Sequence, residues 1–199
     1  MPATIAGVLL AAGDGSRLGQ PKALVELAGQ SLASRGVALL RAGGTDPVIV
    51  VTGAAPVDLP GIRSVLNPRW REGMGSSFAA GLAALPERCD AAVVALADQP
   101  LVGPESVRRL IGAFQAGAAV AVATYSGRPR NPVLLAREHW PRAIELAAGD
   151  VGARPFLRAH PELVTLVECG DTGSPDDIDT PADLERVGRL LGGLPDVPG

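Results

Sequence analysis

The sequence carries little excess charge. Lys and Arg together number 18 and Asp and Glu 21 among 199 residues, which gives a formal net charge of -3 at pH 7. A chain so nearly neutral lacks the general attraction to polyanions on which nucleic-acid binding depends. We therefore expect no DNA or RNA partner.

Cysteine is scarce as well, and long apolar runs are missing. The two cysteines, Cys89 and Cys169, have no neighbouring His or Cys to complete a metal cage, and two thiols make no disulfide framework. No window approaches the roughly 20 apolar residues of a membrane span. The apolar run from Ile5 to Ala12 ends in a glycine loop and has no basic segment before it, unlike a secretion signal. We expect a reduced, cytoplasmic protein without a membrane partner.

Apolar segments alternate with helical patterns along the chain. The expected strands are Thr4 to Leu10, Pro47 to Thr52, Ala91 to Ala97, Ala118 to Thr124 and Leu163 to Val167. The expected helices are Ser31 to Ala42, Ser76 to Leu85, Pro104 to Ala116, Arg137 to Ala147, Val151 to His160 and Pro181 to Leu191. Continuous apolar strands indicate a sheet covered by helices on both faces. The pattern predicts a three-layer α/β fold with a mostly parallel sheet.

No internal repeat or linker divides the chain, and 47% hydrophobic content is enough for one core. Thr180 precedes Pro181 as an N-cap and starts the last expected helix. The glycine- and proline-rich residues 193–199 have too little to bury to stay ordered. We expect one domain over residues 1–192 and a disordered tail over residues 193–199.

A glycine loop follows the first expected strand, where residues 10–22 read Leu-Ala-Ala-Gly-Asp-Gly-Ser-Arg-Leu-Gly-Gln-Pro-Lys. Small residues there let backbone N–H groups approach phosphate oxygens, and Arg17 and Lys22 add positive charge. The third glycine of a dinucleotide fingerprint would fall at Leu18, and no acidic residue ends the second strand at Val50-Val-Thr-Gly53. A Walker loop is absent too, because no Gly-Lys-Ser/Thr follows.

Acidic residues stand at two further places. Asp98 ends a buried strand and precedes Gln-Pro, the position at which an open parallel sheet presents catalytic groups. Asp177 and Asp179 flank Ile178 just before the last helix, so an extended backbone points both side chains the same way. Mg²⁺ commonly takes one or two carboxylates, with phosphates and water completing its shell. Asp98 is the favoured ligand, and either Asp177 or Asp179 completes the site.

The pattern Leu-Ala-Ala-Gly-x-Gly-x-Arg-x-Gly-x-Pro-Lys resembles the nucleotidyltransferase family, and within it the molybdenum cofactor cytidylyltransferases. The resemblance implies a Rossmann-like fold with a nucleoside triphosphate across the first strand. It implies catalytic roles for Arg17, Lys22 and Asp98, with Mg²⁺ held by Asp98 and Asp177 or Asp179. The nucleotide-binding residues it implies are Leu10, Ala11, Ala12, Gly13, Gly15, Lys22, Gly53, Ser76 and Ser77. Those implied for the acceptor phosphate are Arg128, Arg130, Asn131 and Arg154.

The expected reaction is transfer of CMP from CTP to the phosphate of molybdopterin, with release of pyrophosphate and a molybdenum hydroxylase as a possible partner. Ala12 and Pro21 favour CTP over GTP, because the guanylyl branch usually has Gly and Asp there. Gly15, in contrast, is typical of sugar-1-phosphate transferases, so a sugar phosphate acceptor stays open. A non-catalytic cofactor carrier is the alternative from another class, and intact Lys22, Asp98 and Asp179 argue against it.

Overall fold

The computed structural model describes residues 2–192, and these form one seven-stranded sheet in the order β5-β4-β1-β6-β8-β7-β9. Every strand runs parallel to its neighbours except β8, which is antiparallel to both β6 and β7. The strands are β1 Ile5–Leu10, β4 Val48–Thr52, β5 Arg63–Leu66, β6 Ala91–Leu96, β7 Val120–Tyr125, β8 Arg128–Ala136 and β9 Val164–Glu168. The predicted mostly parallel sheet is confirmed.

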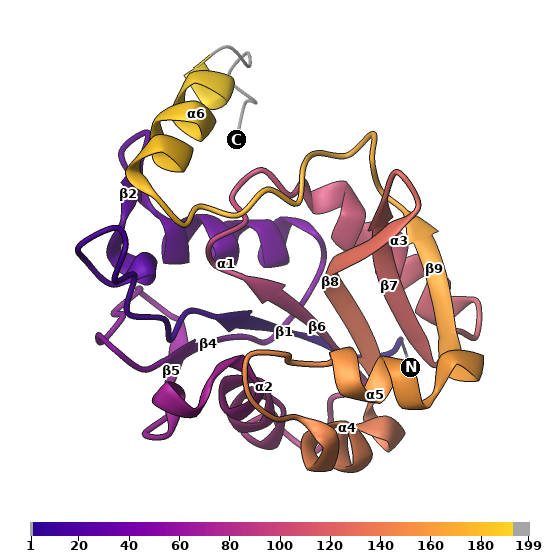
Figure 1. The fold of residues 1–199 in the computed structure, drawn as a ribbon. Helices are drawn as coiled ribbons and strands as arrows, with labels where there is room; N and C mark the ends of the chain where they lie inside the picture. The colour runs from indigo at the N-terminus through magenta and orange to yellow at the C-terminus, as the bar shows by residue number, and fades with distance from the viewer. Residues whose placement is uncertain (1, 193–199) are drawn as a thin grey trace.

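Helices cover both faces of this sheet, which makes the three predicted layers (Figure 1). Helices α1 (Leu32–Ala42) and α3 (Pro104–Gln115) pack on one face. Helices α2 (Met74–Ala83), α4 (Trp140–Leu146) and α5 (Arg154–Ala159) pack on the other. The central strands are apolar throughout because both faces are buried: Leu9 of β1 packs in one core and Val8 in the other.

The last helix, α6 (Pro181–Gly192), lies outside these layers and closes a small third core. Ile178 and Val187 pack there against Leu32 of α1 and against the hairpin of β2 (Glu26–Leu27) and β3 (Gln30–Ser31). The predicted N-cap is confirmed, because Thr180 Oγ1 accepts the Asp183 backbone N–H at 3.2 Å. In Figure 1 the segment from β9 to α6 crosses beside the strand ends. The cap at Thr180 marks the residue at which this segment ends and α6 begins.

Several elements differ from the predictions. The hairpin and strands β5 and β8 were not predicted: β5 is a mostly exposed edge strand, and β8 opens with arginines and prolines that hide its strand pattern. Helix α2 begins two residues before Ser76, and the helix predicted from Arg137 starts as a 3-10 turn before α4. The predicted tail, residues 193–199, lies outside the described residues. Across residues 2–192 no helix combines the length and apolarity needed to cross a bilayer.

Candidate active site

A cavity of about 1020 Å³ opens at the carboxyl ends of β1 and β6, where the glycine loop leaves the sheet. Its walls include segments far apart in the sequence: residues 10–17 with Lys22, residues 70–71, 73–74 and 77–78, residues 96–99, residues 129–131 with Val133, residues 150–154, and Asp177 with Asp179. In a doubly wound α/β sheet this edge is where ligands bind. Its volume is that of a site for a large ligand, just above the usual range for small-molecule pockets.

The glycine loop leaves open space on the cavity wall. Gly13 is exposed on the cavity wall, and a Cβ at this position would meet no atom within 4 Å, so space for a ligand lies beside its backbone. Gly15 has φ +60°, and a Cβ there would stand 2.0 Å from the Gln20 carbonyl oxygen. Glycine at position 15 is therefore required by this loop's own backbone. Arg17 is exposed and also lines the cavity.

Lys22 joins the two acidic segments of the site. Its Nζ donates to Asp98 Oδ2 at 2.7 Å and also to Asp179 Oδ1. The side chains of Lys22 and Asp98 are only 21% and 20% exposed, whereas Asp179 is 45% exposed. The Lys22–Asp98 contact is thus less exposed to solvent than the Lys22–Asp179 contact. Water and salt therefore weaken the attraction between Lys22 and Asp98 less.

A buried isoleucine brings Asp179 to this place. The backbone N–H of Ile178 donates to the Asp98 carbonyl oxygen at 2.8 Å, and its side chain is fully buried in the third core. Buried Gln99 holds the preceding residues, because its Nε2 donates to Asp177 Oδ1 at 2.8 Å and to the Pro175 carbonyl oxygen at 3.1 Å. Both predicted carboxylates line the cavity, but Asp179 faces Lys22 and Asp177 faces Gln99.

Two pKa values record this arrangement. Burial alone would lower the pKa of Lys22, yet the charges and hydrogen bonds of Asp98 and Asp179 outweigh it and raise that pKa above 10.5. The pKa of Asp177 is also raised, first by loss of surrounding water and then by the like charges of Asp98 and Asp179, although Gln99 opposes this. Lys22 is therefore cationic at neutral pH, and Asp177 is the carboxylate whose ionisation its surroundings disfavour.

The donor set fits a magnesium ion shared with a bound phosphate. Asp98 and Asp179 each direct one oxygen at the same point, which Lys22 Nζ occupies. Such a pair of carboxylates, completed by substrate oxygens and water, matches the shell that Mg²⁺ prefers. Within residues 2–192, no group of three or more Asp, Glu, His or Cys side chains could hold a metal by itself. A closed protein cage is therefore absent from this part of the chain.

On the other side of the glycine loop, Asn67 organises the start of α2. This buried side chain donates from Nδ2 to Ser76 Oγ at 2.8 Å and to Ser77 Oγ at 3.0 Å. Ser77 lines the cavity, but Ser76 is turned into the preceding loop, where its hydroxyl donates to backbone carbonyl oxygens. Gly53 is also kept from the wall, since a Cβ there would lie 2.5 Å from Cβ of Trp70. The structure gives these two predicted positions packing roles.

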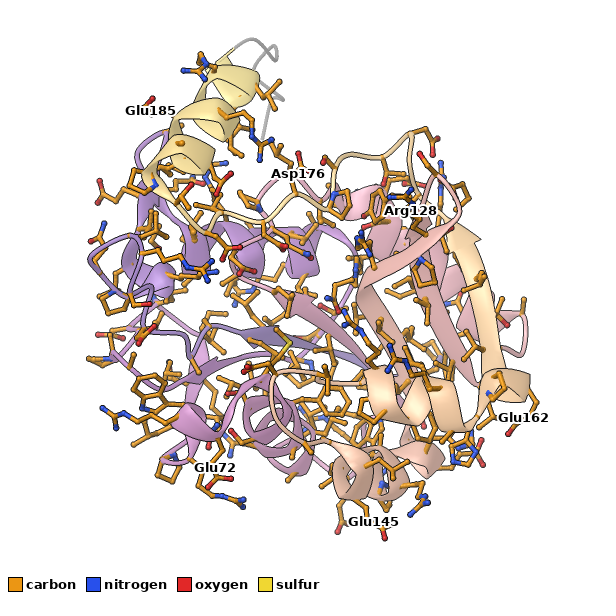
Figure 2. The ribbon with its side chains drawn as sticks, in the orientation of Figure 1. Glu72, Arg128, Glu145, Glu162, Asp176 and Glu185 are labelled. Carbon is orange, nitrogen blue, oxygen red and sulfur yellow. The ribbon has the colours of Figure 1, made fainter. Side chains whose placement is uncertain are left out.

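The predicted acceptor residues lie at the opposite end of the cavity. Arg130, Asn131 and Arg154 line it, the first two from β8 and the third from the start of α5. Arg128 does not line it and stands at the β7–β8 hairpin, where Figure 2 labels it. Asn67 and Gln99 were not predicted as organising residues from the sequence; the signal for Gln99 is its place directly after Asp98.

Comparison with known proteins identifies the family of this chain. Residues 7–164 match the family described as MobA-like NTP transferase domain. Nicotine blue oxidoreductase of Paenarthrobacter nicotinovorans is 37% identical, with 94% of this chain and 96% of that protein covered. A probable molybdenum cofactor guanylyltransferase of Opitutus terrae is 45% identical over 47 residues, 24% of this chain and 23% of that protein.

Two solved structures are similar over nearly their whole length. The Rv0371c homologue from Mycobacterium sp. strain JC1 has a TM-score of 0.81 and 31% identity, covering 94% of this chain and 96% of that one. The manganese complex of Rv0371c from Mycobacterium tuberculosis H37Rv has a TM-score of 0.75 and 27% identity, covering 96% and 100%. The family match contains Lys22 and Asp98 and ends before Asp179. This chain belongs to the family of MobA-like NTP transferase domains, and it is a nucleotidyltransferase.

Proposed function

We propose that this nucleotidyltransferase transfers CMP from CTP to the phosphate of molybdopterin in a magnesium-dependent reaction that releases pyrophosphate. The observation that carries the proposal is the Lys22 ammonium held by Asp98 and Asp179 at the wall of a cavity that also contains the glycine loop. A movable cation, a pair of carboxylates and an open backbone loop are the groups that bind a triphosphate with its metal.

In the proposed reaction an acceptor phosphate oxygen attacks the α-phosphorus of CTP. The bond from that phosphorus to the bridging oxygen breaks, and pyrophosphate leaves with the electron pair. A phosphate nucleophile is already anionic, so no strong general base is needed, and the protein's task is positioning and charge stabilisation. Bound magnesium would supply Lewis-acid stabilisation of the phosphate charge.

The side chains divide this task by position. Residues 11–15 hold the triphosphate through the backbone, and Lys22 stabilises the negative charge that grows at the α-phosphate. Arg17, exposed on the same wall, neutralises the departing pyrophosphate. Asp98 and Asp179 would hold the metal. The manganese named for the 27% identical relative supports a divalent cation in this family. Arg130 and Arg154 orient the acceptor phosphate at the far end.

The sequence pattern at Ala12 and Pro21 supports CTP over GTP, because it resembles that of the cytidylyl branch. The guanylyltransferase relative, matched over 24% of this chain, makes GTP the natural comparison.

Pyrophosphate release with each of the four NTPs tests the proposal. The chain would be assayed with Mg²⁺ and either molybdopterin or glucose 1-phosphate, with no acceptor as the blank. We expect release that depends on CTP and on molybdopterin. Equal release with glucose 1-phosphate would assign the chain to sugar nucleotide synthesis, and tight molybdopterin binding without release under any NTP would make it a carrier.

A second candidate function comes from the relative named nicotine blue oxidoreductase, which is alike over nearly the full length of both chains. A reduced nicotinamide dinucleotide would then occupy the cavity. The loop opposes this reading, because Leu18 replaces the third glycine and β4 ends at Thr52-Gly53 without an acidic residue. Loss of the absorbance of reduced nicotinamide in the presence of a quinonoid dye, with no pyrophosphate from CTP, would favour this candidate.

A further inference from the structure

Lys22 occupies the place between the two carboxylates that would hold the metal. Its Nζ donates to Asp98 Oδ2 at 2.7 Å and also to Asp179 Oδ1. An ammonium group and a divalent ion cannot lie between the same two oxygens, because the two cations would repel each other at contact distance. The side chains of Lys22 and Asp98 are largely shielded from solvent, so water weakens this repulsion little. The chain thus supplies its own cation to the two carboxylates.

A free divalent ion would find few further ligands at this point. Asp177, the neighbouring carboxylate on the cavity wall, is held by Gln99, whose Nε2 donates to Asp177 Oδ1 at 2.8 Å. Within residues 2–192, no group of three or more Asp, Glu, His or Cys side chains could hold a metal. Mg²⁺ gives up its water reluctantly and is usually held by one or two carboxylates together with phosphate oxygens. A free ion would have to displace Lys22 before any phosphate completes its shell.

The backbone of Lys22 is fixed beside the glycine loop. A Cβ at Gly15 would lie 3.0 Å from the Lys22 backbone nitrogen, so the loop and the lysine backbone are in close contact. On the other side, the Val25 N–H donates to the Lys22 carbonyl oxygen at 3.2 Å, and Ala23 is buried. The ammonium stands on a flexible stem from this fixed backbone. It can therefore turn from the carboxylates toward a phosphate on the loop without movement of the backbone.

We propose that the site takes its divalent metal together with the nucleotide, as a metal–nucleotide complex, because Lys22 excludes the free ion from Asp98 and Asp179. When the complex enters, a phosphate of the nucleotide draws the ammonium away, and the metal takes its place between the carboxylates. The proposal rests on the nucleotidyl transfer proposed above. It adds the form in which metal and nucleotide bind, and it gives Lys22 a role before the reaction begins.

Metal binding without nucleotide tests this proposal directly. Free and bound Mn²⁺ would be measured by electron paramagnetic resonance with the full chain, as wild type and as Lys22→Met, and circular dichroism would check folding. We expect Lys22→Met to bind Mn²⁺ at least about 10-fold more tightly than wild type, since the competing ammonium is gone. Lys22→Gln is a second variant with the same expectation if Lys22→Met does not fold. Equal dissociation constants in variant and wild type would overturn the proposal.

A second arginine variant controls for the loss of positive charge. Arg71 lines the same cavity, stacks over the Trp70 ring at 4.5 Å, and makes no ion pair with any carboxylate of residues 2–192. Arg71→Met should leave the Mn²⁺ dissociation constant within about 3-fold of wild type, because salt and water screen a cation that does not touch the two carboxylates. A gain as large as that of Lys22→Met would mean that only the net charge of the cavity matters, and the proposal would be wrong.

Removal of a ligand locates the ion. In Lys22→Met, the further change Asp179→Asn should abolish the gain in Mn²⁺ affinity, because only one of the two carboxylates is left. If the double variant keeps the gain, the ion binds elsewhere and Lys22 does not exclude it from this pair.

Nucleotide should tighten metal binding more in wild type than in the variant. A non-hydrolysable CTP analogue removes the ammonium from the carboxylates only where an ammonium is present, so its effect on the Mn²⁺ dissociation constant should be at least about 10-fold larger in wild type. An equal effect in both proteins would contradict the exchange of lysine for metal.

This proposal and the transfer reaction can fail separately. If Lys22→Met gains Mn²⁺ affinity although no NTP releases pyrophosphate, the nucleotidyl transfer fails and the exclusion of the free ion stands. If wild type binds Mn²⁺ without nucleotide as tightly as Lys22→Met, while CTP and molybdopterin still give pyrophosphate, the transfer stands and the exclusion fails.

Discussion

Lys22 is the only lysine among the 199 residues, and the other 17 of the 18 Lys and Arg residues are arginines. It lies where two carboxylates share its charge. An ammonium group is a compact charge on a flexible stem, whereas a guanidinium is a rigid fork, so lysine can leave the carboxylates for a phosphate when a nucleotide enters. In the proposed reaction, Lys22 would balance the charges of Asp98 and Asp179 before the nucleotide binds and that of the α-phosphate during transfer.

Replacement of Lys22 should abolish most of the catalytic activity and keep the fold intact. We expect Lys22→Ala to lower kcat about 100-fold or more, as is usual when one charge stabiliser is lost from a preorganised site. Pyrophosphate release measures this effect, and circular dichroism checks folding. Arg108→Ala is the control, because Arg108 is an exposed α3 cation paired with Glu105 outside the cavity. Turnover within a few-fold of wild type in Lys22→Ala would remove the lysine from the mechanism.

The raised pKa of Lys22 predicts a stability change at high pH. Because the folded chain holds this proton more tightly than the unfolded chain, the contribution is fully present below the usual pKa of 10.5 and is lost as pH rises through the higher folded value. Chemical unfolding of wild type and Lys22→Met between neutral pH and pH about 11 measures it. The difference in unfolding free energy should be constant up to about pH 10 and fall above it. Tyr125 titrates in both proteins, so its contribution cancels in the difference between the two unfolding free energies. A constant difference throughout would contradict the pKa assignment.

At the scale of elements, the segment between β9 and α6 delivers Asp179 to β6. Figure 2 labels Asp176 on this segment, and Arg186 of α6 donates to the Asp176 carboxylate at 2.8 Å. Ile178, fully buried in the third core, anchors the segment, and its backbone N–H donates to Asp98. The position of Asp179 therefore depends on the packing of α6, although no residue of this helix in the described range lines the cavity.

Truncation of that anchor should damage both stability and metal binding. Ile178→Ala removes a buried side chain and should cost about 2–4 kcal/mol of unfolding free energy. It should also weaken Mn²⁺ binding in the presence of a CTP analogue, since Asp179 is no longer held beside Asp98. Urea unfolding and electron paramagnetic resonance measure the two effects. Leu190→Ala is the control: Leu190 lies on the same helix, 50% exposed, and should change stability by less than about 0.5 kcal/mol. Unchanged Mn²⁺ affinity in Ile178→Ala would show that Asp179 is not a ligand.

The sequence predicted the fully buried strands and missed two partly exposed ones, although the mostly exposed β9 was also predicted. Strands β1, β4 and β6 are buried along their length, and their continuous apolar runs could be recognised. The short strand β5 lies at an exposed edge, and the start of β8 carries exposed arginines, so neither shows an apolar run. Asp98 was recognisable at a strand end, but its pairing with Asp179 depends on tertiary packing around Ile178, which no local pattern encodes.

At the scale of the whole molecule, the sheet places two groups of charged side chains at the two ends of one cavity. The carboxyl ends of β1 and β6 present the glycine loop and Asp98, while antiparallel β8 and the start of α5 bring Arg130 and Arg154 to the other end of the same cavity. In the proposed reaction Arg130 and Arg154 face the acceptor. The helix that carries Arg154 was predicted from the sequence, whereas strand β8, which carries Arg130, was not.

Transfer of label from CTP carrying ³²P at the α-phosphate tests the central claim most directly. The chain would be incubated with labelled CTP, Mg²⁺ and molybdopterin, and the products separated with and without excess EDTA. We predict label on molybdopterin in amounts equal to the pyrophosphate released, and none when EDTA removes the metal. Absence of labelled product with CTP and with equally labelled GTP, ATP and UTP, together with oxidation of a reduced nicotinamide dinucleotide, would contradict the account.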